Sequence, residues 1–321
     1  MRVRAAVAAI LALATAGDVG AAVLDRGYTA PAPVSALDET AAGIATGLAW
    51  TPRSCEAVVL WQPDSFARRT FRAPGPCDQT STGRGVAAVS TDGERVVWLA
   101  YAGGNERDWL LWTATPTART PRRLRFRSAD VDAPAPIVLG NGGEGGIPYA
   151  LGRDVIVIGP TGRRALFWHA PARVVALAQG AGKVGALLDT GHLMVVPLGG
   201  GGARATDLDY APNEVRAFRI AAVGAVVQTR GGIEIRTARR RTPLPTPRGS
   251  RLVGYVDGQL VYAVGGQIRR YWRATGSDVL LRRVRPPFRA EYDRRGLAWV
   301  SGRRVCWAVR VFVEPGPAIR C

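Results

Sequence analysis

Residues 251–285 read RLVGYVDGQLVYAVGGQIRRYWRATGSDVLLRRVR, in which short apolar or alternating segments are separated by glycine-containing turns. Asp257-Gly258 is a dipeptide typical of two-residue hairpin loops, and Gly265-Gly266 marks a second such turn. Four short strands joined in this way predict one four-stranded antiparallel sheet. The four predicted strands are 251–256, 259–264, 267–273 and 278–285.

This group of strands recurs along the chain about every 37 to 51 residues. Val34-Ser35-Ala36-Leu37 matches Val174-Val175-Ala176-Leu177, and further apolar strands follow each. Repeated sheets of this size are typical of β-propeller blades, which bury their apolar faces by stacking on neighbouring blades. We predict seven four-stranded blades, with six as the alternative because the fourth strand of the fifth repeat is weak. The predicted blades begin near Val34, Gly85, Ala135, Arg173, Glu214, Arg251 and Phe288.

Composition and periodicity agree with an all-β globular chain. The 321 residues are 47% hydrophobic, and 39 glycines are spread through the repeats, as many tight turns require. After residue 30, helical periodicity is always interrupted by glycine or proline within about three turns. The fold class is therefore predicted as all-β.

The first 22 residues differ from the rest of the chain. Arg2 and Arg4 precede an apolar run too short to span a bilayer comfortably, and Ala14-Thr15-Ala16 resembles a cleavage sequence. This pattern predicts a secretory signal peptide over 1–22, with an uncleaved anchor as the alternative. An N-terminal segment, 23–33, would then lead into the propeller domain, 34–321. We expect the first and last repeats each to form a complete blade.

All four cysteines follow the signal segment, and an even number in an exported chain predicts disulfides. Cys55 precedes the third strand of the first repeat and Cys77 follows the fourth, so the two lie side by side in an antiparallel hairpin. Cys306 and Cys321 flank a turn sequence in the same way. We predict the pairs Cys55–Cys77 and Cys306–Cys321. A zinc site is the competing interpretation, but no CxxC or histidine spacing supports it.

The chain has a formal net charge of +18, and Lys183 is the only lysine among its 43 basic residues. Arginine doublets fall where outer strands are expected, and charge on exposed edges opposes edge-to-edge aggregation. The alternative is a continuous basic surface, joined by Arg107 and Arg119, that binds an anionic polymer. Nucleic acid is not the favoured partner, because the chain is predicted to be exported and carries no nucleic-acid-binding motif. The arginine groups are Arg68-Arg69, Arg122-Arg123, Arg163-Arg164, Arg239-Arg240-Arg241 and Arg282-Arg283.

The second repeat carries the clearest resemblance to a known family. Residues 85–98, GVAAVSTDGERVVW, resemble the repeat of TolB-like propellers, in which Ser-x-Asp-Gly precedes an apolar strand. The other repeats keep the strand pattern without these letters. The resemblance implies a β-propeller that serves as an interaction platform in the cell envelope. The same blade occurs as a gate in peptidases, but the sequence shows no peptidase domain, so the platform role is favoured.

Candidate ligand contacts lie in the second repeat, where a polar loop, 103–108, is long enough to line one face of the disc. We predict that Trp109 stacks on a sugar ring and that Arg107 and Asp108 make the adjacent contacts. No motif indicates a cofactor or a metal ion. His169 and His192 lie in different repeats and are interpreted as ordinary structural or surface residues.

Three other polar features are given structural interpretations. The pairs Asp130/Asp132 and Asp207/Asp209 alternate along strand ends and could hold a cation, but the surrounding arginines favour charge balance. The glycine-rich segment 140–146 lacks the Gly-Lys-Ser/Thr ending of a phosphate loop and is interpreted as a flexible loop.

These features predict a monomeric, non-catalytic binding module of the cell envelope or exterior, with an unidentified protein or glycan as partner. The alternative is a propeller glycan hydrolase or lyase that uses carboxylates and arginines at its central channel. The two differ in one structural requirement, because catalysis needs several titratable groups held together in a pocket.

Overall fold

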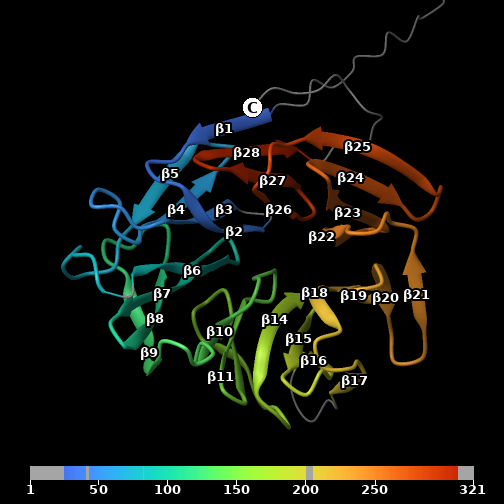
Figure 1. Cartoon of the computed structure of the whole chain (residues 1–321), viewed down its shortest axis with the longest axis horizontal. Helices are drawn as coiled ribbons and strands as arrows, with labels where there is room; N and C mark the ends of the chain where they lie inside the picture. Colours follow the sequence, from blue (N-terminus) through green and yellow to red (C-terminus); the bar gives the residue numbers. More distant parts are fainter. Residues whose placement is uncertain (1–24, 41–42, 82, 200–204, 310–321) are drawn as a thin grey trace, which may run out of the picture.

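The structure, a computed structural model, describes residues 25–40, 43–81, 83–199 and 205–309. Their strands form seven four-stranded antiparallel sheets that stand around a central axis as a β-propeller (Figure 1). The prediction of an all-β chain with seven blades is confirmed, and the six-bladed alternative is wrong. No helix in this described part of the chain could span a membrane. The predicted signal peptide, 1–22, lies outside the described residues.

Blades 1 to 4 each use four consecutive strands, and the first strand of each is innermost. Blade 1 comprises β2 (Val34–Thr40), β3 (Gly43–Leu48), β4 (Val58–Gln62) and β5 (Ala67–Phe71). Blade 2 comprises β6 (Arg84–Thr91), β7 (Val96–Gly103), β8 (Glu106–Ala114) and β9 (Arg122–Asp130). Blade 3 comprises β10 (Ile137–Leu139), β11 (Ile147–Leu151), β12 (Asp154–Ile158) and β13 (Arg164–His169). Blade 4 comprises β14 (Val174–Gly180), β15 (Lys183–Leu188), β16 (Leu193–Pro197) and β17 (Thr206–Leu208).

Blades 5 and 6 repeat this arrangement, and the predicted starts of all seven blades lie within two residues of the observed ones. Blade 5 comprises β18 (Val215–Ala221), β19 (Gly224–Thr229), β20 (Ile233–Arg236) and β21 (Arg241–Leu244). Blade 6 comprises β22 (Arg251–Val256), β23 (Gln259–Val264), β24 (Gln267–Trp272) and β25 (Ser277–Arg283).

Blade 7 is completed by a strand from the other end of the chain. It contains β26 (Phe288–Tyr292), β27 (Gly296–Ser301) and β28 (Arg304–Val309). Its outer strand is β1 (Asp25–Thr29), which pairs antiparallel with β28. The prediction that the first and last repeats each form a complete blade is therefore wrong for the last one. Pairing between the two ends of a chain leaves no local sequence pattern, so repeat counting could not reveal it.

Tyr28 anchors β1 to blade 1. The side chain is 7% exposed, and its ring meets the ring of Trp61 edge to face at a centroid distance of 5.1 Å. The Tyr28 hydroxyl also lies 2.9 Å from Oγ1 of Thr46, within hydrogen-bond distance. The ring of blades is thus joined at its seam by strand pairing and by a buried aromatic contact.

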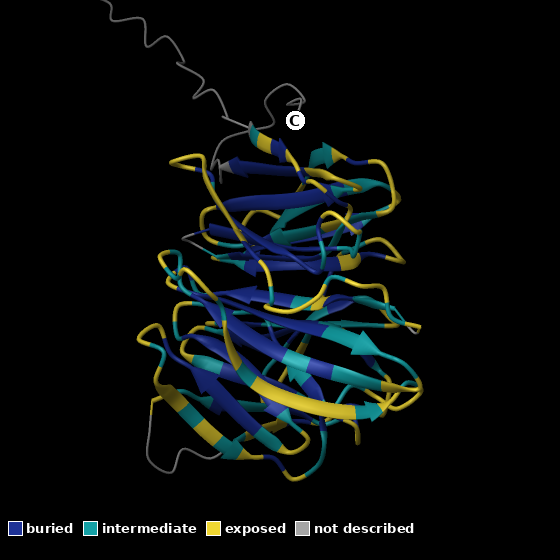
Figure 2. Cartoon of the chain, turned by 90° about the vertical axis from the view of Figure 1, so that its left-hand side faces the viewer, coloured by how far each residue is buried: buried dark blue, intermediate teal, exposed yellow. Residues whose placement is uncertain are grey.

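The blades bury their apolar faces against one another. Between blades 1 and 2, the rings of Phe71 and Trp98 stack at 6.3 Å within one buried cluster. Gly47 lies in the same interface, where a Cβ atom would come within 2.5 Å of Cγ1 of Val86, so only glycine fits. Figure 2 shows the result, with buried positions along the inner strands and exposed ones on loops and outer strands.

A register shift near the start of the first strand recurs in blades 1, 2, 4, 5 and 6. In blades 1, 2, 4 and 5 it coincides with a Val-x-Ala sequence, in which the middle residue is left out of the pairing. In blade 1 this residue is Ser35, whose hydroxyl donates to the carbonyl of Val86 at 3.0 Å. In blade 4 it is Val175, which is 44% exposed.

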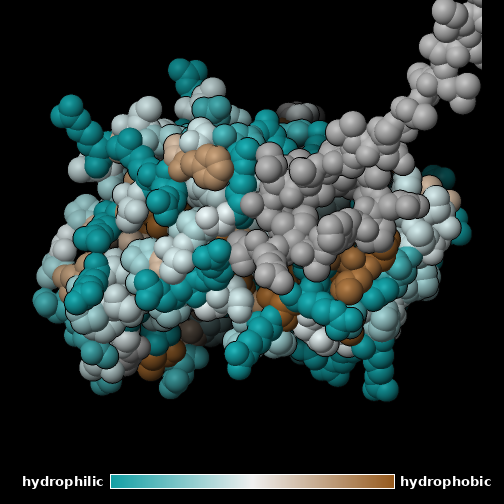
Figure 3. All heavy atoms as spheres, turned by 90° about the horizontal axis from the view of Figure 1, so that it is seen from above, coloured by the Kyte–Doolittle hydropathy of each residue, from teal (hydrophilic) through white to brown (hydrophobic). Residues whose placement is uncertain are grey.

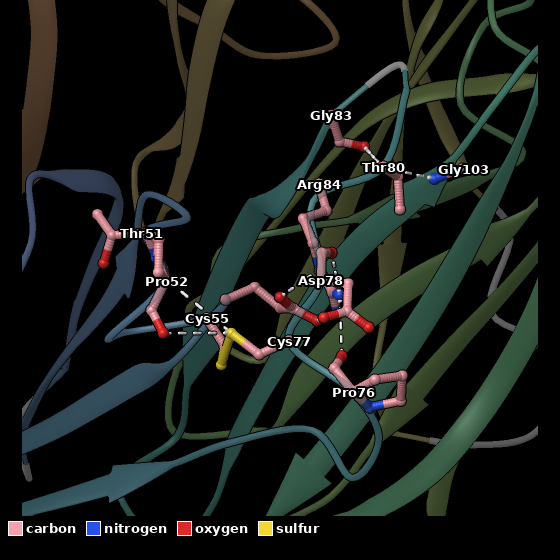
Figure 4. A network of polar contacts seen from close by, with 11 residues as sticks. Thr51, Pro52, Cys55, Pro76, Cys77, Asp78, Thr80, Gly83, Arg84 and Gly103 are labelled. Atoms are coloured by element: carbon pink, nitrogen blue, oxygen red, sulfur yellow. Dashed lines mark hydrogen bonds and ion pairs between the residues drawn. A yellow bond between two sulfur atoms is a disulfide. The ribbon is translucent and has the colours of Figure 1, made fainter.

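The predicted Cys55–Cys77 disulfide is confirmed, with a Cα–Cα distance of 5.4 Å (Figure 4). It ties the segment before β4 to the segment after β5, and closing a loop of this length stabilises a fold by about 3 kcal/mol in the chain-entropy picture. Beside it, Arg84 donates from Nε to a carboxylate oxygen of Glu56 at 2.8 Å. Cys321 lies outside the described residues, so its pairing with Cys306 stays a prediction.

Candidate functional site

The first strands of all seven blades end around one pocket of about 240 Å³. Each blade contributes the end of its first strand or the turn that follows, because these strands stand side by side around the axis (Figure 1). Seven carboxyl groups and two guanidinium groups line the pocket, in contrast to the net positive charge of the chain. In blade order, the polar contributors include Asp38, Asp92, Asn141, Gln179, Arg219, Tyr255 and Glu291.

Asp38, near the end of β2, is 2% exposed and joins blade 1 to blades 2 and 3. Its Oδ2 accepts from the backbone amides of Thr91 at 2.8 Å and Gly142 at 3.4 Å. Its Oδ1 accepts from Nδ2 of Asn141 at 2.9 Å. Burial raises the pKa of Asp38 to about 7, and the neighbouring charge of Glu291 acts in the same direction.

Glu39 follows Asp38 and joins blade 1 to blade 7, because successive side chains of a strand point to opposite faces. Its carboxylate accepts from the backbone amide of Ala298 at 2.8 Å and from the indole of Trp307 at 2.7 Å. Burial, followed by the charge of Asp293, raises the pKa of Glu39 well above its usual range. Two adjacent carboxylates thus bind three different blades to blade 1.

Both arginines of the pocket are held by carboxylates. Arg219 of β18 forms an ion pair with Glu291 of β26, and both side chains are about one-fifth exposed. At the mouth, exposed Arg294 reaches the carboxylate of Glu144 at 2.8 Å, linking the turns of blades 7 and 3. Burial raises the pKa of Glu291, while the Arg219 charge opposes this shift.

Several buried polar atoms of the pocket have no hydrogen-bond partner among the described residues. They include Oε1 of Gln179, the hydroxyl of Tyr255 and Oδ2 of Asp92. Gln179 is 6% exposed and Tyr255 is 8% exposed. Leaving such groups unpaired costs free energy, so these atoms are candidates for hydrogen bonds to a molecule bound in the pocket.

The glycine-rich segment 140–146, predicted as a flexible loop, forms one wall of this pocket. The amides and carbonyls of Gly143 and Gly146 bond to one another at 3.0 and 3.1 Å. A Cβ atom at Gly142 would lie 2.1 Å from the carbonyl oxygen of Thr91. The glycines are therefore required for close approach between blades 2, 3 and 4.

The ligand contacts predicted in blade 2 lie elsewhere. Trp109 on β8 is 8% exposed, and its ring packs 5.7 Å from that of Tyr101 in the cluster between blades 2 and 3. The guanidinium of Arg107 also lies over the Tyr101 ring, at 4.8 Å, and Asp108 accepts from the hydroxyl of Ser128 at 2.6 Å. None of the three lines the central pocket, and their role in ligand binding stays a prediction.

The histidines lie on the outside of the molecule beside carboxylates. Nδ1 of His169 is 2.8 Å from Asp154, and Nδ1 of His192 is 2.8 Å from Asp207 and 3.9 Å from Asp209. The Asp207/Asp209 pair thus faces a histidine rather than the arginines expected from the sequence. No group of three or more potential metal ligands occurs among the described residues.

Each arginine group lies on an outermost strand or on the turn that leads into it. These strands belong to blades 1, 2, 3, 5 and 6, so the groups are spread around the rim. Many guanidinium groups lie over aromatic rings, such as Arg123 over Phe126 at 5.8 Å and Arg164 over Phe167 at 5.4 Å. Figure 3 looks onto the edge of the disc that carries β1, and the described residues visible there are mostly hydrophilic, with small apolar patches between them.

Sequence reasoning missed the central residues Asp38, Glu39, Gln179 and Glu291. One signal was present in the repeat. Asp38 and Glu39 directly follow the apolar start of the first predicted strand, and Glu291 occupies a similar place in the last repeat. The end of an innermost strand lies beside the axis of a propeller, so acidic residues at this place in two repeats were a signal for a central polar site.

The chain matches no protein-family model and no curated protein sequence. Solved propeller structures do match it. YCF48 bound to D1 peptide is 10% identical with a TM-score of 0.58, covering 89% of this chain and 97% of that one. YCF48 from Cyanidioschyzon merolae is 10% identical with a TM-score of 0.52, covering 89% and 98%. The β-propeller domain of Cps50 (Swd1) from Myceliophteria thermophila is 12% identical with a TM-score of 0.52, also covering 89% and 98%. At such identities the likeness shows the fold alone, that of a seven-bladed β-propeller.

Proposed function

We propose that this chain is a non-catalytic, exported interaction module, of the TolB-like kind, that binds a polypeptide segment at the mouth of its central pocket. One observation carries the proposal. All seven blades converge on one pocket whose buried polar atoms include several without a hydrogen-bond partner among the described residues. A concave site with a few convergent polar groups is the usual form of a binding site.

Two further features support a polypeptide ligand. The rim of the pocket on the side of blade 5 presents Val223, which is 40% exposed and offers an apolar contact beside the polar interior. A propeller of the same architecture, YCF48, has been solved bound to a D1 peptide. Peptide binding is therefore an activity that this fold can support.

Export is supported by the signal-like N-terminal sequence and by the Cys55–Cys77 disulfide. Disulfides persist in oxidising compartments and are rare in the cytosol. We infer a location in the cell envelope or outside the cell.

The geometry does not favour the alternative of a glycan hydrolase or lyase. The pocket does hold several carboxyl groups, but three of them, Asp38, Glu39 and Glu291, already serve the structure. Asp38 accepts three hydrogen bonds from blades 2 and 3, and Glu39 accepts two from blade 7. Glu291 is paired with Arg219. A general acid or base must reach a proton of the substrate, and these groups are engaged in holding the blades together.

Selection of random displayed peptides on the immobilised protein tests the proposal. We expect enriched peptides whose affinity falls at least tenfold in a Val223→Trp variant, because the larger side chain obstructs the mouth, and such a fall corresponds to about 1.4 kcal/mol. Val175→Trp is the matched control, because Val175 is similarly exposed but lies at the opposite end of β14 from the pocket. Peptides that bind both variants equally, or no enrichment at all, would contradict the proposal.

A further inference from the structure

The chemistry of the central pocket indicates what kind of group it receives. Carboxyl groups outnumber guanidinium groups by seven to two among its lining residues. Both guanidinium groups are already paired, Arg219 with Glu291 and Arg294 with Glu144. The pocket is thus acidic within a chain of formal charge +18.

The carboxyl groups also act on one another. The charge of Glu291 raises the pKa of Asp38 beyond the effect of burial, and the charge of Asp293 does the same for Glu39. Like charges held close together in a buried site disfavour ionisation, and a cation placed among them relieves this repulsion. A positively charged ligand is therefore favoured over a neutral or anionic one.

The unpaired polar atoms specify hydrogen-bond donors on the ligand. Oε1 of Gln179 is an amide oxygen and can only accept, and Oδ2 of Asp92 can only accept when its carboxyl group is ionised. The hydroxyl of Tyr255 can accept or donate. These residues belong to blades 4, 2 and 6, so they approach the axis from three directions. A planar group with several N–H donors can satisfy acceptors arranged in this way.

The size of the pocket limits the ligand further. A cavity of about 240 Å³ is smaller than the roughly 300–1,000 Å³ typical of sites for drug-sized molecules. It can take one long side chain, whereas a folded partner or a large metabolite would have to remain outside.

We propose that the pocket receives the guanidinium group of an arginine side chain from the bound polypeptide, with Asp92, Gln179 and Tyr255 as its receiving groups. This inference rests on the proposed function and names the ligand chemistry of the same site. Asp92 supplies charge, while Gln179 and Tyr255 supply fixed buried acceptors. The Arg219–Glu291 pair stays in place and forms part of the wall.

The test is a titration of the protein with a short peptide, acetyl-Gly-Gly-Arg-Gly-Gly-amide, in which binding is monitored by NMR. Its matched control replaces arginine with citrulline, which has the same shape but no charge. We expect the arginine peptide to bind at least tenfold more tightly, because hydrogen bonds to charged groups are stronger than neutral ones. Spermidine is titrated in a third arm, and stronger binding of spermidine than of the arginine peptide would overturn the assignment to a polypeptide side chain.

Two variants place the binding site. Oδ1 of Asp92 accepts from the backbone amide of Glu94 at 3.0 Å, and Oδ1 of Asp130 accepts from that of Asp132 at 3.0 Å. Asparagine keeps this contact at both positions and removes only the charge. Asp92→Asn should weaken binding of the arginine peptide about tenfold, whereas Asp130→Asn on outer strand β9 should leave it unchanged.

Equal binding of the arginine and citrulline peptides, or equal effects of the two variants, would overturn this inference. Its failure is distinguishable from failure of the proposed function. If selected peptides lose affinity in Val223→Trp but are indifferent to Asp92→Asn, the central mouth binds polypeptides without an arginine. If no peptide responds to either substitution, both proposals are wrong.

Discussion

Replacing Tyr28 with alanine is expected to destabilise the propeller by about 3–5 kcal/mol, the usual cost of removing a buried aromatic side chain. Tyr28 is 7% exposed and carries the contact of β1 with Trp61 in the neighbouring blade. Since β1 closes the ring of blades, loss of the Tyr28–Trp61 contact weakens the fold at the seam. Urea unfolding followed by tryptophan fluorescence measures the change.

Phe167→Ala is the matched control, because Phe167 also lies on an outermost strand, β13, but is 52% exposed. Surface substitutions of this kind usually change stability by less than about 0.5 kcal/mol. If Tyr28→Ala proved as stable as Phe167→Ala, β1 would not close the ring in solution.

The unfolding free energy is expected to fall as the pH rises from about 4 to about 7. Burial raises the pKa of Asp38 from 3.8 in the unfolded chain to about 7 in the folded protein. The folded state therefore binds a proton at Asp38 more tightly than the unfolded state does, and this difference stabilises the fold. The stabilisation is fully present below the pKa of the unfolded chain and is lost as the pH rises through the pKa of the folded protein. A shift of this size corresponds to on the order of 4 kcal/mol. Burial also raises the pKa values of Glu39 and Glu291, which therefore add to the effect with the same sign.

Asp38→Asn should remove the Asp38 part of this dependence, because asparagine does not titrate. Glu144→Gln is a control at the exposed mouth of the same pocket. The measurement is urea unfolding at pH values from 4 to about 8. A slope that is identical in wild type and Asp38→Asn would contradict the buried position of this carboxyl group.

The blades could be predicted because their signals are local. The alternation of apolar residues and the turn at Asp257-Gly258 depend only on neighbours in the sequence, and the observed β22 and β23 flank this turn. Cys55 and Cys77 could be paired for the same reason, since they belong to one hairpin. The closing strand β1 could not be predicted, because its partner β28 lies at the other end of the chain.

The central pocket depends on contacts between distant parts of the sequence. Asp38 meets Asn141 across 103 residues, and Glu39 meets Trp307 across 268. Neither contact follows from residue spacing until the blade order is known. Trp109 illustrates the opposite error, because an aromatic residue beside a polar loop resembles a ligand contact, whereas here it packs between two blades.

Hydrogen–deuterium exchange of the wild-type protein, with and without a peptide selected on it, tests the central claim most directly. The peptide should slow exchange at the ends of the first strands and the turns that follow them, including 179–181 and 219–223, which line the pocket. Outer strands such as β9 and β13 should exchange at the same rate in both states. Slowed exchange confined to those outer strands would contradict the account and assign binding to the rim.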